Sequence, residues 1–175
     1  MDRATPTPWP HDIHDALKAQ AVRQVAYVPD AGHKELIDLC SADRAMDTVP
    51  LTTEEEGVAL LAGAWLGGQR GVLLMQSSGI GNCVNMFSLT RTCRFPLLML
   101  VTMRGQWAEY NPWQVPMGQI AGEVLRLTGA LVFPVEDARE IGATVAAAAR
   151  MAFDGPAAAA VLIGQRAVGI KTFGR

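Results

Sequence analysis

One stretch of the chain decides the fold. Residues 51–85 read LTTEEEGVALLAGAWLGGQRGVLLMQSSGIGNCVN, and they contain a helix, a strand and a glycine-rich turn in succession. Thr52 or Thr53 can cap the helix, and the three glutamates that follow fall in its first turn, where the helix dipole favours negative charge. We therefore predict a helix that begins beside this acidic cluster.

The helix and strand of this stretch are both unusually apolar. Residues 57–68 are apolar on nearly every face, which predicts a helix that is buried all round, with Gly63 allowing another backbone to approach closely. Residues 71–76 form a strand without alternation, as expected inside a parallel sheet that is covered on both faces. Residues 77–82 follow as a tight turn between this strand and the next helix.

The same succession of apolar strands and helices repeats along the chain. Strands are predicted at 25–28, 48–51, 71–76, 95–102, 131–135 and 157–163, and helices at 11–23, 33–40, 57–68, 80–92, 119–127 and 137–153. This alternation is typical of an α/β fold, so we predict a single three-layer domain with a central, mostly parallel six-stranded sheet. Residues 1–10 are predicted to be an irregular arm, 11–165 the domain, and 166–175 a tail.

Composition restricts the class of protein. The 175 residues are 50% hydrophobic and only 18% charged, with a net charge of −2 and no basic block. This slightly negative net charge gives no reason to expect nucleic acid as a partner. No apolar run without charge or glycine breaks is long enough to predict a membrane span. The low charged fraction predicts surface that is buried against partner subunits.

The three cysteines show no metal-binding spacing and no CxxC pair. This pattern indicates a reduced, cytoplasmic compartment. The alternative reading of any one of them is a reactive, catalytic thiol.

Parallel strands place their carboxyl ends along one edge, where α/β proteins bind ligands. Asp30 and His33 follow the first strand; they are either a turn former and a structural histidine, or an acid–base pair. Residues 77–82 are either a tight turn or an anion cradle, since neither GxGxxG nor GxxxxGK[ST] is present. The aromatic loop 104–116 either folds back on its own core or contacts a pocket or partner.

The glutamate cluster also has two interpretations. Glu54, Glu55 and Glu56 can form a solvated helix start, as such runs usually do. However, the helix that follows has no polar face, so one carboxylate must lie close to buried surface. A buried carboxylate can share a proton with a ligand.

Four segments together resemble a known family. Residues 25–30 with 34–37, 54–63, 76–82 with Asn85, and 104–118 are similar in kind and order to the pyrimidine-binding N-terminal domain of thiamine diphosphate-dependent enzymes, in particular the sulfopyruvate and phosphonopyruvate decarboxylases. The resemblance covers roughly residues 11–165, and it implies a flavodoxin-like strand order. It also implies that thiamine diphosphate is the cofactor.

The resemblance assigns roles to individual residues. The family's functional glutamate precedes a helix glycine by nine positions, which selects Glu54 over its two neighbours; there it would hydrogen-bond the aminopyrimidine ring and activate the cofactor. Asp30 corresponds to an acid that handles protons of the reaction. Further cofactor contacts are implied for Pro29, Gly79, Ile80 and Asn82, and substrate contacts for His33, Ser78, Arg104 and Gln114. Gln114 lies near the position at which the family's pyruvate decarboxylases carry catalytic histidines. Because glutamine cannot relay a proton as histidine does, the expected role of Gln114 is a hydrogen bond to substrate.

The chain also departs from the family. Full-length members carry a second domain with a GDG…N motif that holds Mg²⁺ and the diphosphate, and no GDG occurs here. The resemblance therefore implies the α subunit of a split enzyme, completed by a diphosphate-binding β subunit in a hetero-oligomer of at least two α and two β chains. The expected reaction is decarboxylation of a small 2-oxo acid. The alternatives are a carboligase or lyase subunit with the same cofactor, or a non-catalytic interaction subunit of the same fold.

Overall fold

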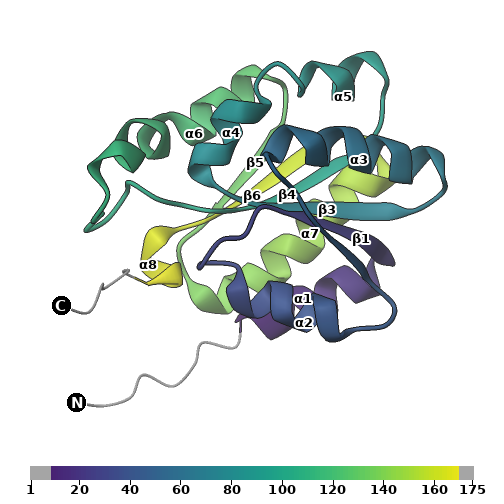
Figure 1. Ribbon diagram of the computed structural model, residues 1–175, viewed down its shortest axis with the longest axis horizontal. Coiled ribbons are helices and arrows are strands. Elements are labelled where there is room, and N and C mark those ends of the chain that lie inside the picture. Colours follow the sequence, from purple (N-terminus) through teal and green to yellow (C-terminus); the bar gives the residue numbers. More distant parts are fainter. Residues whose placement is uncertain (1–8, 170–175) are drawn as a thin grey trace.

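The computed structural model describes residues 9–169, which form a six-stranded sheet between two layers of helices (Figure 1). The strands are β1 (Val22–Tyr27), β2 (Asp47–Pro50), β3 (Arg70–Gln76), β4 (Leu97–Thr102), β5 (Leu131–Val135) and β6 (Ala158–Ile163). All neighbouring strands pair in parallel. The predicted three-layer α/β architecture is confirmed.

The strand order is β2-β1-β3-β4-β6-β5. The first four positions follow the flavodoxin-like order that the resemblance implied, but β6 is inserted between β4 and β5. This insertion brings the carboxyl end of β6 next to that of β4. Gln165, which comes just after β6, therefore lies beside the loop that follows β4.

Helices cover both faces of the sheet. The lower layer in Figure 1 holds α1 (Trp9–Ala19), α2 (Lys34–Ala42) and α7 (Ile141–Asp154), and the upper layer holds α3 (Glu54–Leu66), α4 (Ser77–Cys83), α5 (Ser88–Thr92) and α6 (Val115–Leu127). Successive strand residues pack into opposite cores: Val72 and Leu74 face the lower layer, while Leu73 and Met75 face the upper one. The continuous apolar strands are explained by burial on both faces.

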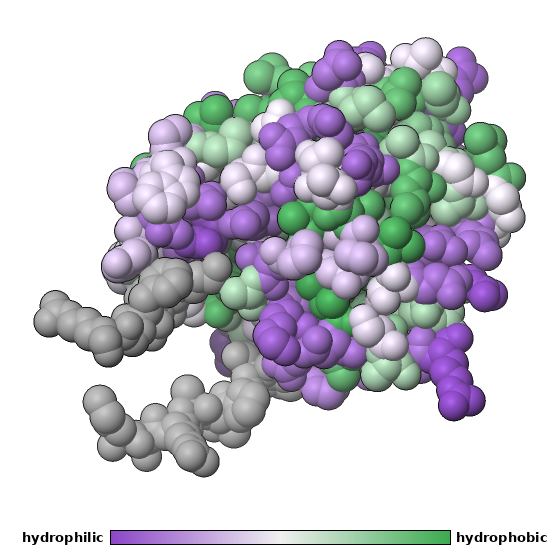
Figure 2. All heavy atoms as spheres, viewed as in Figure 1, coloured by the Kyte–Doolittle hydropathy of each residue, from purple (hydrophilic) through white to green (hydrophobic). Residues whose placement is uncertain are grey.

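The apolar helix α3 differs from the prediction in its burial. Only Glu54, Gly57, Val58 and Leu61 are buried, while Leu66 is 88% exposed. Apolar residues lie at the surface over α3 in Figure 2. Apart from its own turn of α3, no atom lies within 4 Å of the position that a Cβ on Gly63 would occupy, so residues 9–169 make no close approach at Gly63.

The predicted turn at 77–82 is wrong. Gln76 is still extended, and α4 begins at Ser77, immediately after β3. α4 therefore occupies the predicted turn and the first residues of the helix predicted at 80–92. The last residues of that predicted helix form a separate helix, α5. The two glycines of this segment have no positive φ, so they serve close packing rather than an unusual backbone conformation.

Other boundaries shift at the ends of elements. Trp9 and Pro10, predicted to be part of the arm, form the first turn of α1, and Trp9 is buried; the rest of the arm lies outside the described residues. The predicted tail begins with a short helix, α8 (Gln165–Val168), and residues 170–175 lie outside the description. The 3-10 turns η1 (Pro112–Gln114) and η2 (Ala138–Glu140) precede α6 and α7.

The described residues contain no helix that is both long and apolar enough to cross a lipid bilayer.

Candidate active site

Glu54 is the first residue of α3, and its side chain is almost completely buried, at 6% exposure. Its Oε2 accepts a hydrogen bond of 2.8 Å from the side-chain amide of Asn82. The neighbouring Glu55 and Glu56 are exposed, and Glu56 accepts a hydrogen bond from the backbone N–H of Thr52, just before the helix. The three glutamates thus have different environments, and Glu54 alone is buried, as predicted.

Gly79 of α4 forms the notch in which Glu54 lies. A Cβ added to Gly79 would lie 2.5 Å from Cγ, Cδ and Oε1 of Glu54, which is closer than any real contact. Gly81, two residues on, has open surroundings, with Met117 Sδ at 3.7 Å as the nearest neighbour. The glycine at 79 is therefore required for the carboxylate to sit between α3 and α4, whereas the glycine at 81 is not.

The other predicted cofactor residues lie in different surroundings. Asn82 and Pro29 are exposed, and Ser78 is half-buried. Ile80 is fully buried in the upper core and offers no accessible surface. The cofactor contact predicted for Ile80 stays a prediction.

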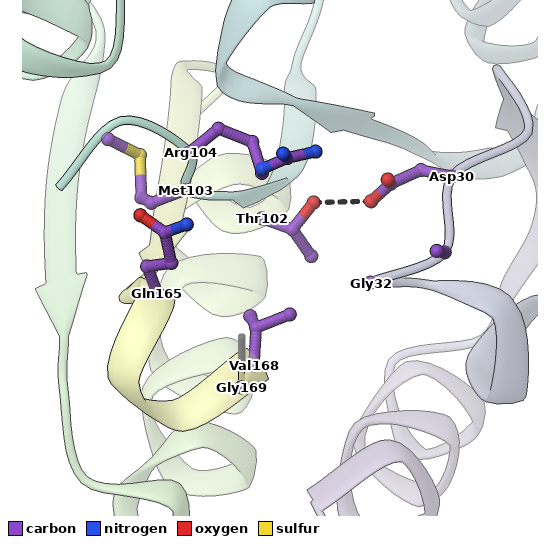
Figure 3. A pocket seen from close by; sticks show the side chains of 9 residues that line it. Asp30, Gly32, Thr102, Met103, Arg104, Gln165, Val168 and Gly169 are labelled. Atoms are coloured by element: carbon purple, nitrogen blue, oxygen red, sulfur yellow. Dashed lines mark hydrogen bonds between the residues drawn. The ribbon is translucent and has the colours of Figure 1, made fainter. Parts of the chain in front are cut away.

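Asp30 belongs to a second group at the same sheet edge. Its Oδ2 accepts a hydrogen bond of 2.5 Å from the hydroxyl of Thr102 at the end of β4. Gly32 closes this group from the side, since a Cβ there would lie 2.9 Å from Asp30 Oδ2. Figure 3 shows Asp30, Thr102 and Arg104 turned toward one space, with Gln165 and Val168 opposite. These residues line a cavity of about 90 Å³ that would admit only a small group.

His33 lies in the interior, beneath the carboxyl edge of the sheet. It is fully buried, and its Nε2 lies 3.0 Å from the carbonyl oxygen of Leu100 in β4. Burial lowers the pKa of His33, against the opposing effect of nearby Asp30, so the ring is neutral. Its Nδ1 is buried without a hydrogen-bond partner among the described residues, and the substrate contact predicted for His33 stays a prediction.

Arg104 is buried, but it is already paired. Its Nε and Nη2 donate hydrogen bonds of 2.8 and 2.5 Å to the two carboxylate oxygens of Glu109. Although burial would raise the pKa of Glu109, the hydrogen bonds from Arg104 and from the backbone of Asn111 and Gly105 outweigh it and lower that pKa to about 2. The guanidinium of Arg104 is therefore paired with the carboxylate of Glu109 within this chain. The substrate contact predicted for Arg104 stays a prediction.

Sequence reasoning missed Gln165. This buried side chain accepts hydrogen bonds from the backbone N–H groups of Gln106 and Trp107, both at 2.9 Å, and donates to Glu109 at 3.0 Å. No local pattern marks the position, since its importance arises only from the placement of β6 beside β4. A single glutamine after a strand has no distinguishing signal in one sequence.

Gln114 connects the loop to the end of β3. Its side-chain nitrogen lies 3.4 Å from the side-chain oxygen of Gln76, and its own oxygen is buried without a hydrogen-bond partner among residues 9–169. The backbone N–H of Arg104 donates to the hydroxyl of Ser77 at 3.0 Å. The group around Glu54 and the group around Asp30 and Arg104 are thus joined through the first residues of α4.

Comparison with known proteins decides the family. Residues 10–128, well over half of the chain, match the family described as thiamine pyrophosphate enzyme, N-terminal TPP binding domain. The chain belongs to the thiamine pyrophosphate enzyme family. Among its relatives is the sulfopyruvate decarboxylase subunit alpha of Methanocaldococcus jannaschii, which is 40% identical over 108 residues, or 61% of this chain and 64% of that subunit.

Further relatives match a similar share of the chain. The sulfopyruvate decarboxylase subunit alpha of Methanothermobacter thermautotrophicus is 36% identical over 66% of this chain and 70% of its own length. The phosphonopyruvate decarboxylase of Streptomyces viridochromogenes is 37% identical over 66% of this chain, but only 30% of its own length is matched.

The fold itself recurs in a solved structure. A chain of the 2-oxoglutarate:ferredoxin oxidoreductase of Magnetococcus marinus superposes with a TM-score of 0.71 at 13% identity, covering 91% of this chain and 29% of that one. At this identity the likeness concerns the fold alone. It supports the description of the chain as one α/β domain of a kind found within larger enzymes.

Proposed function

We propose that this chain is the pyrimidine-binding subunit of a thiamine diphosphate-dependent 2-oxo acid decarboxylase, and that Glu54 is its catalytic residue. One observation carries the proposal: Glu54 is buried in a notch that only glycine at position 79 can form, and Asn82 holds one of its two oxygens. A buried, oriented carboxylate of this kind can hold a proton against a heterocyclic nitrogen, because little water is present to compete for it.

The residues around Glu54 fit the pyrimidine end of the cofactor. Bound thiamine diphosphate supplies the carbon nucleophile and the electron sink that loss of CO₂ requires. Glu54 would hold a proton at Oε1 while Asn82 keeps Oε2 in place, and the backbone of Gly79, Asn82 and Pro29 would form the surrounding wall. Asp30, oriented by Thr102, would handle a proton on the substrate side, and Ser78 and Gln114 would bind substrate. Arg104 would contribute through the guanidinium nitrogen that its pair with Glu109 does not use.

A second subunit would complete the site. In this proposal it holds the diphosphate and Mg²⁺, and the active unit contains at least two copies of each chain. The low charged fraction of the chain and the exposed apolar residues over α3 support a large subunit interface. The names of the relatives support sulfopyruvate or phosphonopyruvate as substrates to test first.

The test combines the purified chain with a separately purified chain that carries the GDG…N motif, thiamine diphosphate and Mg²⁺, and measures CO₂ released from a panel of 2-oxo acids. We expect release only from the mixture, and a loss of at least about 100-fold in Glu54→Gln, as for removal of a general acid–base group. The exposed neighbour Glu55→Gln serves as the matched control. Full activity in Glu54→Gln would refute the catalytic assignment, and activity of this chain alone would refute the split site. Product analysis with an added acceptor aldehyde distinguishes decarboxylation from carboligation.

A further inference from the structure

The loop after β4 presents aromatic side chains to solvent. Trp107, Tyr110 and Trp113 are 48%, 65% and 72% exposed, and Val115 beside them is 37% exposed. Four large side chains with apolar surface thus lie within nine residues of one loop. Clusters of exposed tryptophan and tyrosine are typical of protein interfaces, where they supply much of the binding energy.

This loop is held rigidly from beneath. The carboxylate of Glu109 accepts hydrogen bonds from the Arg104 side chain, from the backbone N–H of Gly105 and of Asn111, and from Gln165. Gln106 and Gln165 form reciprocal bonds, since the side-chain oxygen of each accepts from the backbone N–H of the other. The aromatic residues therefore project from a fixed base, and binding a partner would cost little conformational entropy.

The two ends of the loop are fixed as well. Gly118 in α6 lies against the carbonyl oxygen of Arg104, and a side chain there would clash with that backbone. The side chain of Gln119 donates a hydrogen bond of 2.7 Å to the carbonyl oxygen of Gly105. On the outer surface, the guanidinium of Arg166 lies 4.0 Å from the ring centre of Trp107, which sets the orientation of that ring.

The base of this loop is bonded to the sheet edge that carries Glu54. Arg104 bonds to Ser77 at the start of α4, and Gln114, next to Trp113, reaches Gln76 at the end of β3. The notch of Glu54 and Gly79 is built on that same helix. A protein that covers the carboxyl edge of the sheet over Glu54 would therefore meet this loop.

We propose that the loop, residues 104–116, is a docking surface for the diphosphate-binding subunit, with Trp113 and Trp107 as its main anchors. The identity of the partner rests on the proposed function; the exposed aromatics and the hydrogen bonds that join the base of the loop to the Glu54 edge are independent of it. Trp107 and Trp113 then contribute to the affinity between subunits, and their replacement leaves the chemistry unchanged once the subunits are assembled.

The test measures binding of the diphosphate-binding subunit to the wild-type chain, Trp113→Ala and Trp107→Ala by calorimetry, with thiamine diphosphate and Mg²⁺ present. Each variant is expected to bind at least tenfold more weakly, and kcat at saturating partner is expected to stay within twofold of wild type. Trp113→Phe should recover most of the affinity. The matched control is Leu127→Ala: Leu127 is 85% exposed at the far end of α6, and its replacement should leave affinity unchanged.

Several outcomes would overturn the proposal. Unchanged affinity in both tryptophan variants would do so, as would an equal loss in Leu127→Ala. A lowered kcat with unchanged affinity would assign the loop to substrate instead, and loss of self-association of this chain without an effect on partner binding would assign it to contacts between copies. If wild-type subunits bind through the tryptophans but release no CO₂ from any 2-oxo acid, the docking surface stands and the proposed function fails.

Discussion

The side-chain amide of Asn82 donates a 2.8 Å hydrogen bond to Oε2 of Glu54, and this contact links the exposed side of α4 to the first turn of α3. The two residues are 28 positions apart in sequence. The bond leaves Oε1 of Glu54 as the oxygen that lies closest to Gly79 in the notch. The catalytic assignment of Glu54 depends on this geometry, and the first two predictions test it.

Gly79→Ala should inactivate the assembled enzyme, while Gly81→Ala should not. The new methyl group at 79 would overlap the Glu54 side chain and push the carboxylate out of its notch. At 81 the nearest atom is in ordinary contact, and alanine favours a helix over glycine by up to about 1 kcal/mol, so this control should be neutral or slightly stabilising. CO₂ release and thermal unfolding of both variants check the prediction; equal activity of the two would contradict it.

Asn82→Ala should lower kcat/KM by roughly tenfold or more without unfolding the chain. Hydrogen bonds to charged groups contribute about 1.5–3 kcal/mol, and Asn82 is exposed, so its loss affects the orientation of Glu54 more than the core. Asn85→Ala, an exposed asparagine one turn further on, is the matched control. Steady-state kinetics of both variants provide the measurement, and a large loss at Asn85 alone would argue against a role for Asn82.

Glu109→Gln should destabilise the fold by about 3 kcal/mol, because it leaves the buried guanidinium of Arg104 without its counter-ion. The free energy of unfolding in urea measures the effect. Asp137→Asn is the comparison variant. Arg139 also lowers the pKa of Asp137 to about 2, but this ion pair is exposed, so its loss should lower the free energy of unfolding much less than Glu109→Gln does.

The stabilisation from Glu109 should also depend on pH. The pKa of Glu109 falls from 4.5 to about 2 on folding, so the folded state favours the charged form. Its contribution is therefore complete above about pH 4.5 and is lost as the pH falls through about 2. The difference in unfolding free energy between wild type and Glu109→Gln should shrink across this window, and a difference that grew toward acid pH would reverse the expected sign.

The cysteines should differ sharply in reactivity. Burial raises the pKa of the Cys40 and Cys83 thiols to about 12, whereas Cys93 is exposed. At pH 8 a thiol reagent should modify one equivalent rapidly in the native chain and three after denaturation. Cys93→Ser should abolish the fast phase. Rapid modification of the Cys93→Ser chain would show that a buried thiol is accessible.

The glutamate cluster shows how far the sequence alone could lead. Its position before an apolar helix predicted that one carboxylate would be buried, and the family resemblance selected Glu54. The sequence also predicted the parallel sheet, since strands such as β3 and β4 are too uniformly apolar to have a solvated face. It could not predict that Ser77 begins a helix, because glycine-rich segments are poor helix formers in isolation and only packing against Glu54 explains Gly79.

Sequence by itself determined the alternation of strands and helices and the uniformly apolar strands, because these are properties of local pattern. Tertiary structure alone decided which polar residues meet. His33 lies buried against Leu100 of β4, Arg104 pairs with Glu109, and Gln165 bonds to the loop after β4 because β6 lies beside β4. Hydrogen bonds and ion pairs act only over a few ångströms, so residues distant in sequence acquire these functions only when the sheet order brings them together.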